Sequence, residues 1–299
     1  MKKWIVISIA IPVVGFILLN IIFSSNGKQV RVRKGIKASS ASIYRVIADQ
    51  QTWDKLFPGE FTITKKLLNS VHINTSVNNK TAPGSIMLIP ETNDSTAVLW
   101  ESTVPAFSGI FSTISEVATG HNLINKITHT IDSLKNFSIH SINIYGINII
   151  QTSTKDTSLI TTKFKTHTYP LNEEIYAQIA KLKSFAASHN ASPSGYPMLN
   201  VSTVDSSVYH CMVALPIDRV IQTGYSAPIR YVYMVPGRFL TAEIKGGPHT
   251  IQHAHKMMQQ YFQDYKRTAM AIPFEYLVTD RLNEKDTSQW ITRIYAPVY

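Results

Sequence analysis

Three histidines close together, His249, His253 and His255, are the first residues whose type and spacing suggest chemistry. Zinc proteases place two histidines four residues apart on a helix, in an HExxH pattern whose glutamate acts as the general base. His249 and His253 share a helix face at this spacing, but His255 lies across it and the HExxH pattern is missing. We therefore predict no metal site and expect these histidines to be solvated or to cap a helix.

Other reactive groups are equally sparse. Cys211 is the single cysteine, which excludes an intramolecular disulfide, a cysteine zinc cluster and a CxxC redox pair. It lies in the apolar run YHCMVALPI, where we expect a small core residue rather than a nucleophile. The sequence also has no G-x-S-x-G elbow, P-loop or G-x-G-x-x-G turn. It predicts neither a catalytic centre nor a bound cofactor.

An uncharged apolar segment, residues 4–23, is the strongest single signal in the chain. As a helix, about 20 residues match the roughly 30 Å hydrocarbon core of a bilayer. A cleaved signal peptide is the alternative, but the run is longer than a usual signal sequence, and Phe23 stands where cleavage would need a small residue. We predict an uncleaved, single-pass transmembrane anchor within residues 1–27, with the lipid bilayer as its partner.

The formal net charge of the chain is +10, and many of its basic residues flank this apolar segment. Charge in that place determines membrane topology or attracts acidic headgroups. Five basic residues follow the segment and two precede it, which favours cytoplasmic soluble domains. The stretch KQVRVRKGIKA also alternates as a strand does, so these charges can instead belong to a domain surface. Neither a helix-turn-helix nor a basic recognition helix is present, and we expect no nucleic-acid partner.

Residues 28–137 are predicted to form a first soluble module of the α+β class. A strand leads into a short helix capped by Ser39 or Ser40, and four alternating runs separated by turn signals follow. Apolar residues then recur at helical spacing towards residue 137. The stretch RKGIKASSASIYRVIADQQTWDKLFPG resembles the START-like or SRPBCC superfamily, which includes polyketide cyclase-like proteins. Trp53 stands where such proteins place a tryptophan after the first helix.

This resemblance implies a helix-grip fold with an apolar cavity between the sheet and a long C-terminal helix. Aromatic residues at such spacings are more often core than cavity lining, so we predict none of them as a site residue. The residues concerned are Trp53, Phe57, Trp100, Phe107 and Phe111.

Residues 138–299 form the second predicted module, and they contain a repeat. Residues 158–217 and about 238–299 each read as a strand, a turn containing proline, an amphipathic helix and two further strands. We predict two βαββ units side by side, with a groove at their junction that favours a ligand. The module resembles the GyrI-like family, the effector-binding domain of AraC- and MerR-type regulators. The resemblance rests on FLTAEIKGGPH, PFEY, Trp290 and the closing TRIYAPV.

The family resemblance implies that a small, often aromatic or cationic molecule binds in the central cleft. Relatives carry a pocket glutamate on the closing strand, where this chain has Arg293. A guanidinium repels a cation and offers a fork to carboxylate or phosphate, so we expect a neutral or anionic, amphiphilic guest. Alternatively, Arg293 pairs with Glu243 or Glu275 and closes the pocket. The predicted ligand-binding residues are Arg293, Tyr276, Tyr295, Trp290 and Glu243.

Two functions are compatible with these patterns. The first is a membrane-anchored sensor or carrier that binds a small molecule between the two repeats. The second is a hydrolase or cyclase, because some relatives of the family hydrolyse small substrates with a pocket glutamate and tyrosine. Arg293 replaces that glutamate, and Glu243 would have to act as the general base.

Overall fold

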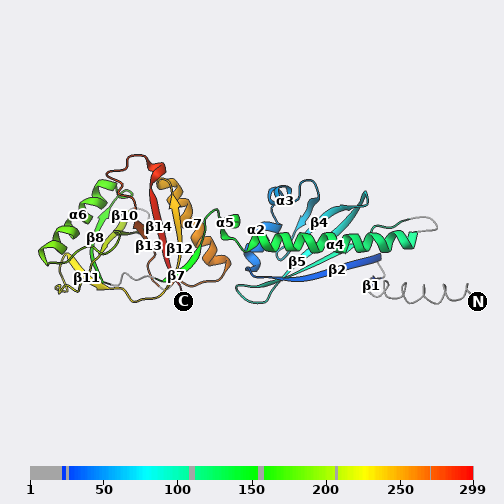
Figure 1. The fold of residues 1–299 in the computed structure, drawn as a ribbon, viewed down its shortest axis with the longest axis horizontal. Coiled ribbons are helices and arrows are strands. Elements are labelled where there is room, and N and C mark those ends of the chain that lie inside the picture. The colour runs from blue at the N-terminus through cyan, green and yellow to red at the C-terminus, as the bar shows by residue number, and fades with distance from the viewer. Residues whose placement is uncertain are drawn as a thin grey trace, which may run out of the picture. The chain divides into compact units, whose positions relative to one another are not determined.

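The structure is a computed structural model, and its fold is shown in Figure 1. The chain divides into two compact units, Met1–Ile144 and Tyr145–Tyr299. The sequence placed this division after Phe137, which is part of the long helix of the first unit. The described residues are 22–24, 27–107, 112–153, 158–205, 208–269 and 271–298.

Most of the predicted membrane segment, residues 4–23, lies outside the described residues. Its last two residues, Ile22 and Phe23, belong to the short strand β1 (Ile22–Ser24) and pair with the next strand. The helix predicted at these two positions is therefore wrong. Within the described part of the chain, no helix is both long and apolar enough to span a bilayer.

The first unit is an antiparallel sheet with three helices. Its strands follow the order β1-β2-β6-β5-β4-β3. Strands β3 to β6 form a meander in sequence order, and β2 lies between β6 and β1. The remaining strands are β2 (Gly27–Ile36), β3 (Phe61–Lys66), β4 (Ser70–Val77), β5 (Lys80–Pro90) and β6 (Thr96–Thr103). The helices are α2 (Ser40–Ile47), α3 (Gln50–Leu56) and α4 (Ser112–Ser138).

Local sequence explains where the two short helices begin. The Ser39 side chain accepts a hydrogen bond from the backbone N–H of Ser42 at 3.1 Å, which confirms the predicted cap of α2. Asp49 caps α3 in the same way, because its carboxylate accepts from the Thr52 N–H at 3.0 Å. These caps satisfy backbone donors that the first turn of a helix leaves without partners.

The core of the first unit is one continuous buried cluster between the sheet and α4. Trp53 lies edge-on to Trp100, with ring centroids 6.1 Å apart, and packs 4.9 Å from the ring of Phe61. Trp53, Phe57 and Trp100 are all buried, as predicted, and α4 covers them with the side chains of Leu123 and Ile127. Phe107 is half-buried beside Lys80, and Phe111 lies outside the described residues. These buried aromatic side chains thus belong to one packed core together with residues of α4.

The second unit contains an eight-stranded antiparallel sheet in the order β11-β8-β10-β9-β13-β14-β12-β7. Its outer strands are β7 (Ile150–Ser153), β8 (Ser158–Thr166), β11 (Ile229–Tyr233) and β12 (Arg238–Lys245). Its inner strands are β9 (Met198–Asp205), β10 (Val208–Pro216), β13 (Phe274–Leu277) and β14 (Ile291–Val298). The helices are α6 (Asn172–Ser188), α7 (Pro248–Asp264) and the 3-10 turn η1 (Thr287–Gln289). The short helix α5 (Ser141–Tyr145) contains the boundary between the two units.

The order strand, helix, strand, strand occurs twice in this sheet, as β8-α6-β9-β10 and β12-α7-β13-β14. The α+β class is therefore confirmed. The two βαββ units join through β9 and β13, which pair only at Glu275 with Leu199 and at Tyr276 with Met198. Cys211 is a buried core residue in β10, as expected, and burial raises the pKa of its thiol.

Candidate functional site

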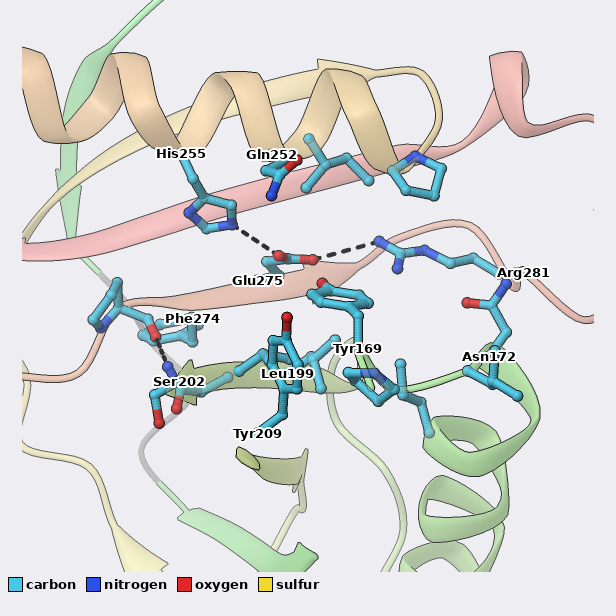
Figure 2. A pocket seen from close by; sticks show the side chains of 18 of the residues that line it. Tyr169, Asn172, Leu199, Ser202, Tyr209, Gln252, His255, Phe274, Glu275 and Arg281 are labelled. Carbon is cyan, nitrogen blue, oxygen red and sulfur yellow. Dashed lines mark hydrogen bonds and ion pairs between the residues drawn. The ribbon is translucent and has the colours of Figure 1, made fainter. Parts of the chain in front are cut away.

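A cavity of ≈ 700 Å³ lies where the two βαββ units meet. Its walls come from the start of α6, one side of α7 and the inner strands β9 and β13. Figure 2 shows His255 and Gln252 reaching in from α7, with Tyr169, Tyr209 and Leu199 on the opposite wall and Arg281 at one end. Most of the lining is apolar, and a few polar groups converge on it, as in small-molecule sites.

The turn before α7 brings the start of that helix to the cavity. Gly246 has a φ of 143°, which favours glycine, and an added Cβ there would lie 2.9 Å from the hydroxyl oxygen of Thr250. Pro248 then occupies the first turn of α7, where its missing N–H costs nothing and its fixed φ suits the helix. Pro248 and His249 both line the cavity, so the KGGPH sequence shapes one of its edges.

A buried charged group lies at the centre of the site. Glu275 is only 6% exposed, and its two carboxylate oxygens have different partners. Oε1 lies 2.8 Å from Nε2 of His255, and Oε2 lies 3.5 Å from Nη2 of Arg281 (Figure 2). Arg281 is 8% exposed and donates a second, shorter hydrogen bond from Nη2 to the Thr292 hydroxyl at 2.8 Å. The pair places two opposite charges in a desolvated wall of the cavity.

Strand alternation puts Glu275 there. β13 has the sequence FEYL and all four residues are buried, so both faces of this strand are covered. Successive side chains point to opposite faces of a sheet. Glu275 consequently points to the face with α6 and α7, while Phe274 and Tyr276 belong to an aromatic cluster on the other face.

Tyr169 adds a neutral donor to the cavity. Desolvation raises the pKa of Tyr169 to about 12, with a smaller contribution from the Glu275 carboxylate. Its ring lies edge-on to Tyr209, with centroids 5.9 Å apart. The residue as a whole is about half exposed, but its ring extends toward Glu275 (Figure 2). At neutral pH this phenol keeps its proton and can donate to a guest.

The structure divides the five predicted ligand-binding residues between two faces of the sheet. Trp290 lines the cavity, and its ring lies 5.0 Å from the guanidinium carbon of Arg281. Arg293 instead lies directly across from Glu243 on one neighbouring strand and from Tyr276 on the other. Residues directly opposite each other in a sheet share a face, so these three side chains point away from the cavity. Tyr295 lies with them, 4.8 Å from the ring of Tyr276.

Of the alternatives open for Arg293, the structure shows the ion pair with Glu243. The Arg293 Nε donates to Glu243 Oε2 at 2.8 Å, and this hydrogen bond raises the pKa of Arg293. The two side chains remain 40% and 55% exposed. The sequence correctly placed them on neighbouring strands of one sheet, but it could not determine which face they occupy.

A second hollow of ≈ 730 Å³ lies on the face opposite the helices. Its lining is almost entirely apolar, and the exposed Arg238 is its one charged residue among those described. The adjoining aromatic rings pack on one another, with Phe274 stacked on Tyr295 at 5.3 Å. It has no buried charge, so it lacks the convergent polar groups that distinguish the cavity between the helices.

Sequence reasoning missed most of the polar residues in the cavity. His255 was expected to be solvated or to cap a helix, and it hydrogen-bonds Glu275 instead. Glu275 had one usable signal, because a charge inside the short apolar strand FEYL must be paired when that strand is buried. Arg281 lies in a polar loop and gave no signal. Within the described residues, no group of three or more His, Cys, Asp or Glu side chains could hold a metal ion.

Comparisons with known proteins give structural likeness only. No family model matches the chain, and no curated protein matches it. Parts of the chain are similar to the crystal structure of the EcmrR C-terminal domain, with 11% identity and a TM-score of 0.42 over 51% of this chain and 98% of that one. SAV2435 bound to tetraphenylphosphonium has 14% identity and a TM-score of 0.32 over 51% and 93%. The ZhuI aromatase/cyclase from Streptomyces sp. R1128 has 10% identity and a TM-score of 0.30 over 37% and 93%. Each of these likenesses covers only part of this chain, and each has a TM-score below 0.5.

Proposed function

We propose that this protein binds a small molecule in the cavity between α6 and α7 and acts as a sensor or carrier. The observation that carries the proposal is the ≈ 700 Å³ cavity with a buried, hydrogen-bonded charge pair in its wall. Ligand sites typically have volumes of about 300 to 1,000 Å³, a mostly apolar lining and a few placed polar groups. A purely structural role would not require this charge pair, because packed apolar side chains in its place would cost less free energy than the desolvation of two charges.

The charges favour a neutral or anionic guest. Glu275 is the one acidic side chain in the cavity wall among the described residues, and Arg281 and His255 already hold its carboxylate. A lipophilic cation would need an uncompensated carboxylate, so we expect weak binding of such a guest. The lining also includes Trp290, Tyr169 and Tyr209, which suit an aromatic or amphiphilic body.

Ligand-dependent thermal stabilisation of the full-length protein in detergent tests this proposal. A panel of aromatic acids, neutral aromatics and the cation tetraphenylphosphonium should include compounds that raise the unfolding temperature. Thr203→Trp should abolish the shift because Thr203 lines the cavity, on the same strand face as Leu199, whereas Ser194→Trp, on an exposed loop, should preserve it. Binding that persists in Thr203→Trp, or no stabilisation by any compound, would reject the cavity as a ligand site.

We also propose that residues 4–21 anchor the chain in a membrane, with the folded units on the cytoplasmic side. The support is the uncharged apolar run and the excess of basic residues that follows it. Cell fractionation followed by protease protection of inverted and right-side-out vesicles tests both parts. Recovery of the intact chain in the soluble fraction would exclude the anchor, and digestion from the outer side only would reverse the orientation.

A hydrolase or cyclase remains the second candidate function, with a different residue as base. Glu243 cannot serve the cavity, because it pairs with Arg293 on the opposite face. Glu275 is better placed, since it is a buried carboxylate 2.8 Å from His255 in the cavity wall. Turnover of an ester, epoxide or lactone that Glu275→Gln abolishes would support catalysis. No turnover across such a panel would leave binding as the function.

A further inference from the structure

We propose that Arg281 recognises the guest and that its partner is an oxyanion, such as a carboxylate, on an aromatic molecule. This inference rests on the proposed function of the cavity. It names Arg281 as the residue that selects the ligand, and it gives the ligand a negative charge beside Arg281. None of the five residues singled out from the sequence has this role.

The first support is the hydrogen bonding of Arg281 itself. A guanidinium has five N–H donors, but both hydrogen bonds described for this side chain come from Nη2, to Thr292 and to Glu275. Among the described residues, its buried Nε has no hydrogen-bond partner. A desolvated guanidinium with unused donors is costly unless an acceptor completes it. The side chain lines the cavity, so a guest can supply that acceptor after a small rotation of the guanidinium.

Glu275 compensates Arg281 only in part. The contact between them is 3.5 Å long, at the limit for a hydrogen bond, whereas Glu275 is 2.8 Å from His255. The carboxylate is therefore shared, and its shorter contact goes to the imidazole. A charged hydrogen-bond donor thus remains available at the Arg281 end of the cavity.

The start of α7 adds positive potential to the same wall. Helix N-termini carry exposed N–H donors and a partial positive charge, which favour anions. No side chain caps α7, and its first turn has no acidic residue. The start of α6 differs, because Glu173 and Glu174 lie in its first turn and Glu174 accepts a hydrogen bond from the Leu171 N–H at 2.8 Å. Only α7, of the two helices at the cavity, leaves its positive end uncompensated.

Arg281 and the start of α7 are held together through Trp290. The Gly246 N–H donates to the Trp290 carbonyl oxygen at 2.9 Å, just before α7 begins. The Trp290 ring in turn lies 5.0 Å from the Arg281 guanidinium. This arrangement keeps the two positive features at one end of the cavity. The aromatic residues Tyr169 and Tyr209 line another part of the wall, where the body of an aromatic acid would lie.

Three probes of one shape and different charge test the inference: 2-naphthoate, 2-naphthamide and 2-naphthylmethylammonium. Their binding to the full-length protein in detergent is measured by calorimetry. Because only the acid offers a negatively charged acceptor to the Arg281 guanidinium, naphthoate should bind about tenfold or more tightly than the ammonium compound. The amide should lie between them. Equal affinities, or a preference for the ammonium compound, would overturn the inference.

Two variants assign the charge preference to its residues. Glu275→Gln should strengthen naphthoate binding by removing the competing carboxylate, and a misfolded protein could not show such a gain. Arg281→Gln should remove the preference for naphthoate over naphthamide. Arg219→Gln, which alters an exposed ion pair with Asp218, is the matched control and should bind like the wild type.

The outcomes separate this inference from the proposed function. Loss of naphthoate binding in Glu275→Gln, with tighter binding of the ammonium compound to the wild type, would make Glu275 the anchor and overturn the role of Arg281. The cavity would then still be a ligand site. If none of the three probes binds, the inference is overturned, and the wider thermal-shift panel with Thr203→Trp decides the proposed function separately.

Discussion

The two units use similar layers, sheet and helices, but they fill the space between those layers differently. In the first unit, α4 covers the sheet and four aromatic rings occupy the interior, led by Trp53 and Trp100. In the second unit, α6 packs on β8 and β10 and α7 on β12, and a cavity remains between the two helices where β9 meets β13. In these two units of the same α+β class, the side chains between the sheet and the helices therefore decide whether there is room for a guest.

The largest expected effect concerns the aromatic core of the first unit. Trp100→Ala should lower the free energy of unfolding of that unit by about 4 kcal/mol, because it removes a fully buried ring from a packed core. Leu68→Ala, at a position that is 98% exposed, is the control and should change it by less than about 0.5 kcal/mol. Denaturant unfolding checks both. A loss below about 1 kcal/mol for Trp100→Ala would mean that this interior is loosely filled, and the contrast between the units would disappear.

The buried charge pair of the second unit should have the next largest effect. Glu275→Leu should destabilise this unit by about 3 kcal/mol, because it leaves the Arg281 charge buried without its carboxylate partner. The double variant Glu275→Leu with Arg281→Met should recover most of that loss, since well-packed apolar residues can replace a buried pair. Chemical denaturation of the three proteins makes the comparison. Equal losses in the single and double variants would show that the pair is not coupled.

Alkaline pH should affect the second unit through Tyr169. The folded-state pKa of Tyr169 is raised to about 12, above its ordinary value near 10, so the folded state holds this proton more tightly. The resulting contribution to stability is present below the ordinary pKa and is lost as the pH rises through about 12. Tyr169→Phe should remove the late-titrating phenol from an ultraviolet absorbance titration. An unchanged titration curve near pH 12 would show that another tyrosine accounts for it.

The smallest effect should come from the exposed pair on the opposite face. Glu243→Gln breaks its hydrogen bond with Arg293, but exposed pairs contribute only about 0 to 1 kcal/mol. Ligand binding in the cavity should also be unchanged, because both side chains lie on the other side of the sheet. Thermal unfolding and calorimetry with the best-binding probe check this. A binding loss of tenfold or more would return these residues to the ligand site.

Prediction from the sequence succeeded for features that depend on residues close together in the chain. Apolar periodicity and turn residues indicated the α+β class and the strand-helix-strand-strand order of both repeats, and Ser39 marked the start of α2. The candidate site was predicted less well, since only Trp290 of the five chosen residues reaches the cavity. Arg293 and Tyr295 were correctly expected to share a face, but alternation along one strand does not say which face lies under the helices.

By itself, the sequence determined the apolar N-terminal run, the exclusion of a disulfide between two of these residues and the repeated order of elements, because each depends on composition or on neighbours along the chain. The tertiary structure alone decided that Glu275, Arg281 and His255 meet. Glu275 comes from a strand, Arg281 from a loop and His255 from a helix 20 residues away from Glu275. Strand register and helix packing bring these three together, and both depend on long-range burial that no short stretch of sequence encodes.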